Sequence, residues 1–204
     1  MTARLVETKS GLGLVDDDDD DGMAPLVIDL AHARRLSSED DLLRALGRGK
    51  GVLTVVDATA GIGRDAAALA LAGFEVTAIE RSPLVQALWK DALARHHPPR
   101  LRFVDVDAVA FLDSVAETAN APDAVFLDPM YPGSKRKSQA QREMRILRAA
   151  VGDDVDVELL FAAARRAARK RVVIKRSNKA PLAKGESASW SHGSTRFDMY
   201  LRPA

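Results

Sequence analysis

Val52-Leu-Thr-Val-Val56 runs directly into Asp57-Ala-Thr-Ala-Gly-Ile-Gly63, so a short apolar run ends in an acid and a glycine-rich turn. The apolar run is typical of a buried strand in a parallel sheet. The alanine-rich segment from about Arg64 to Ala72 predicts a helix directly after the turn. Because such a turn brings backbone amides close to a ligand, this stretch predicts the first strand–turn–helix unit of a ligand-binding α/β fold.

The same alternation of strands and helices continues along the chain. Further strands are expected at 74–79, 101–104, 124–127 and 171–175, and further helices at 83–95, 108–118, 138–150 and 155–169. Residues 188–201 predict a closing antiparallel hairpin through Gly193. Strands that alternate with helices imply a doubly wound, mostly parallel sheet, here with a C-terminal antiparallel hairpin.

The first part of the chain has a different pattern. Residues 1–49 are expected to form an N-terminal extension ahead of the main domain, 50–204. Apolar alternation at 11–15 and 26–30 predicts two short strands around six consecutive aspartates, Asp16 to Asp21. Since these aspartates repel one another, they are expected to form a mobile surface loop. They lack the alternating spacing and the glycine of a calcium-binding loop.

Composition narrows the class of protein. The chain has 204 residues, no cysteine and no apolar stretch long enough to span a membrane, which suits a soluble cytoplasmic domain. Its four histidines show no metal-ligand spacing, so no metal is expected. The net charge is only +1, yet from Pro129 onward there are 17 Lys and Arg against 7 Asp and Glu. This basic part favours a polyanionic partner, although solvated helix faces would also account for it.

A second motif, Val125-Phe-Leu-Asp-Pro-Met-Tyr-Pro132, places an acid at a strand end. Pro129 cannot extend the strand ladder, so Asp128 should stand at the carboxyl edge, where ligands of open α/β sheets bind. Asp128 can accept hydrogen bonds from an exocyclic amine, and Tyr131 offers a flat face for a nucleobase. The alternative is a strand end followed by a plain proline turn.

The first motif predicts the type of cofactor. Gly61 and Gly63 form the turn, and Glu80 follows at a distance that suits ribose hydroxyls. The glycine turn alone would also permit a nicotinamide cofactor. Asp57, however, would repel a pyrophosphate and attract the ammonium of S-adenosylmethionine (SAM). Asp107 could accept from an adenine amine or could simply cap a helix.

Together these motifs resemble the J-type family of bacterial small-subunit ribosomal RNA guanine-N2 methyltransferases, from about residue 50 to the C-terminus. The resemblance is carried by Asp57-Ala-Thr-Ala-Gly-Ile-Gly-Arg-Asp65, Glu80-Arg81, Asp128-Pro-Met-Tyr-Pro132, Arg142-Glu-Met-Arg145, Arg171-Val-Val-Ile-Lys-Arg176 and Arg196-Phe-Asp-Met-Tyr200. It implies a Rossmann-like class I methyltransferase domain over 50–204, with 16S ribosomal RNA or the small ribosomal subunit as partner. SAM contacts are implied at Arg64, Asp65, Glu80, Arg81, Asp107, Ala108 and Asp128. The chain departs from the family at Asp107 and Ala108, where the family tends to carry small hydroxyl residues.

The resemblance implies methyl transfer to the exocyclic N2 of a guanosine, with Asp128, Pro129 and Tyr131 as the predicted catalytic corner. Basic residues that follow this corner are expected to contact RNA phosphates: Lys135, Arg136, Lys137, Arg142, Arg145, Lys175 and Arg176. Three other functions remain possible at this point. They are an amine methyltransferase for another base of RNA or DNA, a nicotinamide-dependent oxidoreductase, and a cofactor-binding RNA chaperone without turnover.

Overall fold

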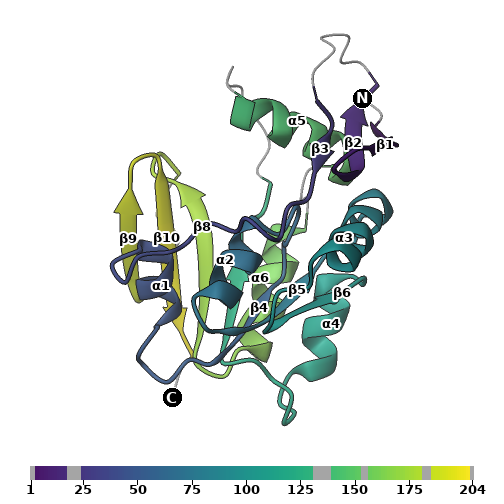
Figure 1. The fold of residues 1–204 in the computed structure, drawn as a ribbon. Coiled ribbons are helices and arrows are strands. Elements are labelled where there is room, and N and C mark those ends of the chain that lie inside the picture. Colours follow the sequence, from purple (N-terminus) through teal and green to yellow (C-terminus); the bar gives the residue numbers. More distant parts are fainter. Residues whose placement is uncertain (1–2, 18–23, 131–138, 153–155, 181–184, 203–204) are drawn as a thin grey trace.

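The computed structural model describes residues 3–17, 24–130, 139–152, 156–180 and 185–202 (Figure 1). Side chains at 139–142 and 144 are also left undescribed. Several predicted residues therefore lie outside the described residues, namely Asp18 to Asp21, Tyr131, Lys135, Arg136, Lys137 and the side chain of Arg142.

The main sheet has seven strands in the order β6-β5-β4-β7-β8-β10-β9. Strands β4 to β8 run parallel to one another, whereas β10 is antiparallel to both β8 and β9. The doubly wound sheet and its C-terminal hairpin are therefore confirmed. The strands are β4 (Thr54–Asp57), β5 (Glu75–Ile79), β6 (Leu101–Val104), β7 (Ala124–Leu127), β8 (Arg171–Ser177), β9 (Ala188–His192) and β10 (Thr195–Leu201).

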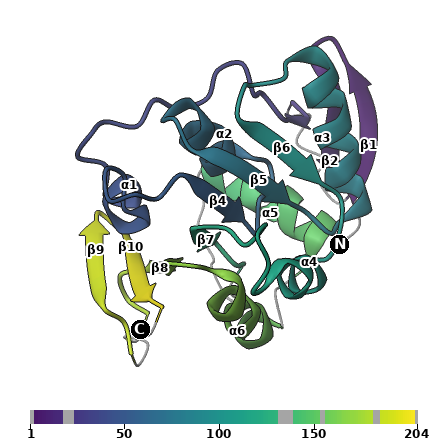
Figure 2. The same cartoon turned by 90° about the horizontal axis from the view of Figure 1, so that it is seen from below.

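Helices cover both faces of this sheet, as the view from below shows (Figure 2). One core contains residues of α1 (Asp41–Leu46), α2 (Arg64–Leu71) and α3 (Pro83–Arg95), and the other contains residues of α4 (Ala108–Val115) and α6 (Val157–Ala167). Local sequence features determine where two of these helices begin. Proline stands at the first turn of α3, and the Asp107 carboxylate caps α4 by accepting from the Ala110 N–H at 3.0 Å.

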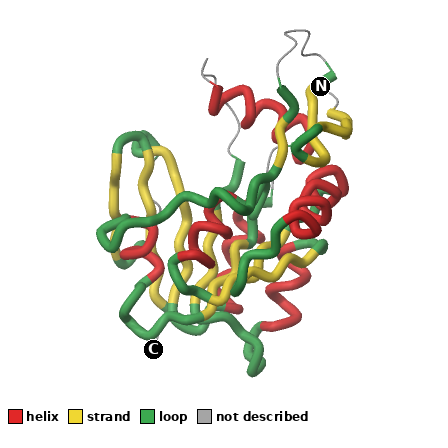
Figure 3. The backbone as a smooth tube through the Cα atoms, in the orientation of Figure 1, coloured by secondary structure: helices red, strands yellow, loops and turns green. Residues whose placement is uncertain are grey.

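A small antiparallel sheet lies against α3 and α5 (Gln139–Val151), above the main sheet (Figure 3). Its strands are β1 (Ala3–Thr8), β2 (Gly11–Asp16) and β3 (Leu26–Val27), in the order β1-β2-β3. The strand predicted at 11–15 is found as β2, and the one predicted at 26–30 is found as the shorter β3, which pairs with β2; β1 was not predicted. Leu14 of β2 is fully buried in the same core as α1, so the first 49 residues share a core with the sheet. A domain boundary at residue 49 stays a prediction.

The aspartate run begins inside this small sheet. Asp16 is the last residue of β2; it is buried, and its Oδ2 lies 3.4 Å from Nε of Arg145. Asp17 pairs with Arg4 at 2.9 Å. The prediction that the whole run is a surface loop is therefore wrong for Asp16, because a basic side chain from α5 compensates its burial.

The neighbouring strands β4 and β7 determine where a ligand can bind. From β4 the chain continues to β5 on one side, and from β7 it continues to β8 on the other. The carboxyl ends of β4 and β7 therefore flank the topological switch point, where open α/β sheets bind ligands. Asp57 is the last residue of β4, and Asp128 directly follows β7. None of the helices in the described ranges combines the length and the apolar character needed to cross a membrane.

Candidate active site

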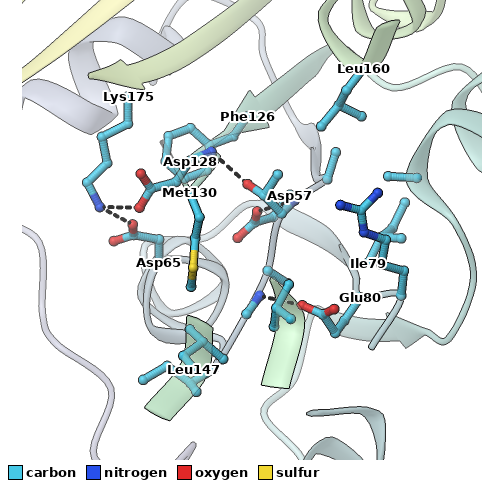
Figure 4. A pocket seen from close by; sticks show the side chains of 18 of the residues that line it. Asp57, Asp65, Ile79, Glu80, Phe126, Asp128, Met130, Leu147, Leu160 and Lys175 are labelled. Atoms are coloured by element: carbon cyan, nitrogen blue, oxygen red, sulfur yellow. Dashed lines mark hydrogen bonds and ion pairs between the residues drawn. The ribbon is translucent and has the colours of Figure 1, made fainter. Parts of the chain in front are cut away.

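A cavity of about 230 Å³ opens at this switch point (Figure 4). The ends of the five parallel strands, or the turns after them, contribute residues that line it, which follows from the common direction of those strands. Of the predicted site residues, those that line the cavity are Asp57, Gly61, Arg64, Asp65, Glu80, Arg81, Asp107, Ala108, Asp128 and Lys175. Gly63, the last residue of the turn before α2, does not line the cavity.

The glycine turn is fixed by an aromatic side chain of α3. The Trp89 Nε1–H donates to the Gly61 carbonyl oxygen at 2.7 Å, and the Trp89 ring stacks on Phe103 with a centroid distance of 4.7 Å. Gly63 has a φ of +77°, and a Cβ there would lie 2.5 Å from the Trp89 ring. Only glycine meets both conditions, because the backbone conformation and the close approach each disfavour a side chain.

Glu80 connects the glycine turn to the next strand. Its carboxylate accepts from the Gly61 N–H at 3.2 Å and from the Ser82 N–H at 2.7 Å, so both oxygens are held in place. Each carboxylate oxygen has a second lone pair that can accept from a ligand hydroxyl. The position suits the predicted ribose contact at the end of β5.

Asp57 is the most deeply buried acid that lines the cavity, with 2% of its surface exposed. Its Oδ1 accepts from the Thr59 N–H at 3.2 Å. Burial raises the pKa of Asp57 to about 8, and the nearby carboxylates of Asp65 and Asp128 add to the rise. A cationic ligand group beside Asp57 would favour the ionised form and lower this pKa.

Lys175, on β8, joins two acids of the site. Its Nζ lies 2.7 Å from Oδ2 of Asp128 and 3.0 Å from Oδ2 of Asp65 (Figure 4). Burial by itself would lower the pKa of Lys175, but the two carboxylates outweigh burial and raise it, so the ammonium stays charged. Lys175 therefore belongs to the cavity, whereas the sequence predicted an RNA phosphate contact.

Asp128 remains accessible despite this ion pair. Its side chain is 39% exposed and lines the cavity. The Asp128 N–H donates to Oγ1 of Thr59 at 2.6 Å, which ties the end of β7 to the turn after β4. The acid of the second motif and the glycine turn of the first are thus neighbours in space.

Arg176 does not accompany Lys175. Successive residues of a strand point to opposite faces, and Nε of Arg176 lies 3.6 Å from Oδ2 of the fully buried Asp198 on β10. Arg176 therefore does not line the cavity, and its predicted RNA contact stays a prediction. A second predicted RNA contact, Arg145, is 47% exposed and pairs with Asp16.

Two predicted cofactor contacts have protein partners at the rim of the cavity. Arg64 pairs with Glu143 of α5 at 2.5 Å, and Arg81 pairs with Asp156, just before α6, at 2.7 Å. Asp107 caps α4, so the cap that competed with an adenine contact is confirmed, although Asp107 also lines the cavity.

Sequence reasoning missed several lining residues. Thr59 lies in the glycine-rich turn 57–63 and Met130 in the segment 128–132, but the sequence predicted no role for either residue. Apolar side chains also line the cavity and suit the faces of a flat ring: Ile79, Val109, Leu147 and Leu160. A position within two residues of an acid at or after a strand end was the available signal for Thr59, Ile79, Val109 and Met130. Leu147 and Leu160 lie on α5 and α6, away from such acids, and had no such signal. Within the described ranges, no three acidic or histidine side chains gather in a way that could hold a metal ion.

Comparison with known proteins decides the family. The model of the family described as "Putative SAM-dependent methyltransferase" matches residues 2–202. The chain belongs to this family. It is 37% identical over 188 residues to ribosomal RNA small subunit methyltransferase J of Haemophilus ducreyi, covering 85% of this chain and 74% of that protein. It is 43% identical to the protein of the same name from Hydrogenovibrio crunogenus, covering 72% of this chain and 57% of that protein.

A solved structure agrees over nearly the whole chain. The SAM-dependent methyltransferase of Neisseria gonorrhoeae superposes with a TM-score of 0.74 at 29% identity, covering 98% of this chain and 83% of that one. The chain is thus a SAM-dependent methyltransferase of Rossmann-like fold, and a nicotinamide oxidoreductase is excluded. The cavity fits SAM, because a buried acid at the end of β4 can meet its ammonium and apolar side chains can flank its adenine.

Proposed function

We propose that this methyltransferase acts on the exocyclic N2 of a guanosine in 16S ribosomal RNA. The observation that carries the proposal is the position of Asp128, an amine-accepting carboxylate exposed in the same cavity as the glycine turn. The relatives named as ribosomal RNA small subunit methyltransferases support an RNA substrate. Such a substrate is assembled in the cytoplasm, where we place the enzyme.

Asp128 provides the main chemical contribution. Bound SAM supplies a methyl group on a positively charged sulfur, which is already a good leaving group, so alignment of the acceptor is the main requirement. Guanine N2 is a weak nucleophile because its lone pair is delocalised into the ring. A hydrogen bond from this amine to Asp128 would favour the geometry in which the lone pair points at the methyl carbon. As the N–C bond formed and the S–C bond broke, positive charge would grow on nitrogen, and the carboxylate would stabilise this charge more than it stabilises the neutral amine. The methylated nitrogen would then lose one proton, which Asp128 or water could accept.

The remaining residues divide between cofactor and RNA. Asp57 would take the ammonium of SAM and Glu80 its ribose, while Asp107 and Ala108 would lie along its adenine. Arg64 and Arg81, each already paired with an acid, would act mainly by holding the rim in place. Tyr131, next to the corner, would stack on a base that has left its helix, as base-modifying enzymes require.

One experiment tests this function against its alternatives. Small ribosomal subunits and protein-free 16S RNA, both from cells that lack this enzyme, are incubated with the protein and methyl-labelled SAM, and the RNA is digested to nucleosides. N2-methylguanosine is the expected product, and Asp128→Ala is the inactive control. Label on adenine or cytosine would instead indicate another base amine. Calorimetric binding of SAM without any label in RNA would mean that the enzyme methylates another substrate.

A further inference from the structure

A second hollow adjoins the cofactor cavity. It has a volume of about 940 Å³ and lies between the segment 34–44, which leads into α1, and the ends of β8 and the β9–β10 hairpin. Asp65 and Lys175 line both hollows. The ammonium of Lys175 therefore stands where the two hollows meet, within hydrogen-bond distance of Asp128.

The charged residues around this second hollow favour an uncharged group of the ligand that carries hydrogen-bond donors and acceptors. Arg34 pairs with Asp40 at 3.0 Å and Arg44 pairs with Asp41 at 3.3 Å, so each of these arginines in its wall lies beside an acidic group. Phosphate groups would meet both carboxylates here, and the attraction of the arginines would be largely cancelled. A nucleobase carries no charge and can use donors and acceptors together.

Lys175 and Asp128 form a donor and an acceptor side by side. Nζ can only donate, the carboxylate can only accept, and the two atoms are 2.7 Å apart. The pairing edge of guanine presents the O6 acceptor next to its N–H donors, whereas adenine presents an amine donor in place of O6. The pair in the protein is therefore complementary to guanine, and an adenine in the same orientation would place its amine against the ammonium.

We propose that the second hollow takes the acceptor guanosine, and that Lys175 reads its O6 while Asp128 accepts from its amine. This inference rests on the proposed function and adds the group that selects guanine. Lys175 has a long stem, so its Nζ can shift from Asp128 toward O6 while it keeps its contact with Asp65. Asp65 is thus a positioning residue for Lys175.

The test uses RNA in which the methylated guanosine is replaced by an analogue. Once that position is mapped, synthetic RNA carrying guanosine, 2-aminopurine or 2,6-diaminopurine there is ligated into full-length 16S RNA and assembled into subunits. Both analogues keep the amine, but the first lacks O6 and the second has an amine in its place. Wild-type enzyme should prefer guanosine in kcat/KM by roughly 10- to 100-fold, with diaminopurine the poorest substrate.

Lys175→Met should lower kcat/KM for guanosine and remove most of this preference, because the group that distinguishes O6 is gone. Asp65→Asn should reduce the preference partly. Lys170→Met is the matched control, since Lys170 also pairs with an acid, Asp123 at 3.0 Å, but at the opposite end of β8. It should leave the preference unchanged. Calorimetry measures the SAM affinity of each variant. A variant that binds SAM normally but has lost the preference for guanosine has lost recognition of the base and not of the cofactor.

Several outcomes would overturn the proposal. If Lys175→Met lowered kcat/KM equally for all three substrates, the lysine would only neutralise the charge of Asp65 and Asp128. Equal use of the three substrates by wild-type enzyme would also refute it, even if no variant folded. Wild-type enzyme that methylates no guanosine of the small subunit would instead refute the proposed function.

Discussion

Trp89 holds the glycine turn by donating its indole N–H to the Gly61 carbonyl oxygen at 2.7 Å, while its ring occupies the space where a Cβ of Gly63 would lie. The two contacts place one side chain of α3 behind the turn that faces the cofactor. The shape of the turn therefore depends on packing outside the cavity as well as on the flexibility of glycine.

We predict that Gly63→Ala lowers both stability and SAM affinity. The positive φ costs about 1–2 kcal/mol for a residue with a Cβ, and the overlap with Trp89 adds a further cost of about 1–3 kcal/mol. Gly73→Ala is the matched control, because Gly73 also has a positive φ, +103°, but open space around its Cβ position. Thermal unfolding and calorimetry should show the larger loss in Gly63→Ala. Equal losses would mean that Trp89 is not the constraint.

The sequence predicted the strand-end acids well for a physical reason. An apolar run that ends in an acid, as at Asp57 and Asp128, marks the carboxyl end of a strand. Because the strands are parallel, their carboxyl ends all lie at the same edge of the sheet. Helix α3 also begins and ends as predicted, since proline marks its first turn. Local patterns were sufficient wherever the feature depends on a single strand, helix or turn.

Contacts between distant elements could not be predicted in this way. Whether Lys175 points into the cavity depends on which face of β8 packs against α1 and which against α6, and the charge pattern of Lys175 and Arg176 is the same in either register. Asp16 pairs with Arg145 because α5 lies against the small sheet, a contact across more than one hundred residues. Both outcomes are set by packing between elements.

The raised pKa of Asp57 predicts proton release when SAM binds. In the folded protein this acid, with its pKa near 8, is mostly protonated at pH 7, and the ammonium of SAM would favour its ionised form. Calorimetry at pH 7 in buffers of different ionisation enthalpy should detect release of up to about one proton, which should decline above pH 8. Asp57→Asn should remove this release. If the heat of SAM binding to the wild-type protein did not depend on the buffer, the predicted proton release would be contradicted.

The same pKa has a consequence for stability. Because the pKa of Asp57 is higher in the folded protein than the ordinary value of 3.8, its contribution to stability is complete below about pH 4. That contribution is lost progressively as the pH rises from about 4 to about 8, because over this range the unfolded chain has released the proton that the folded protein still holds. Without SAM, Asp57→Asn should therefore flatten the fall in melting temperature between about pH 5 and pH 8, relative to the wild-type protein.

Asp128→Asn should separate charge from hydrogen bonding at the amine. The amide oxygen can still accept from N2, but it carries no charge to stabilise the cation that forms. We expect kcat to fall by roughly 10²-fold while SAM binding weakens only a few-fold. Asp113→Asn is the control, because Asp113 of α4 pairs with Arg166 of α6 at 2.6 Å and neither residue lines the cavity. Near-normal turnover in Asp128→Asn would show that the charge of this carboxylate is not needed.

Arg81 and Asp156 should act as a unit in SAM binding. Their side chains are 36% and 26% exposed, and their ion pair joins the turn after β5 to the start of α6 across the cavity rim. A double-mutant cycle with Arg81→Ala and Asp156→Ala should give a coupling of about 0.5–1 kcal/mol in the SAM dissociation constant. Additive losses would instead indicate that each side chain contacts SAM separately.

The basic segment after the Asp128 corner should determine how RNA binding depends on salt. Each phosphate contacted contributes roughly 0.7 to 0.9 to the slope of log affinity against log salt, so replacing Lys135, Arg136 and Lys137 by Ala should lower that slope by up to about 2–3. The matched control removes three basic residues from the β6 end of the sheet: Lys90, Arg100 and Arg102. Because these lie at the far edge from β8, they should leave the slope nearly unchanged. Equal changes in both triple variants would mean that overall charge, and not contact at the corner, attracts the RNA.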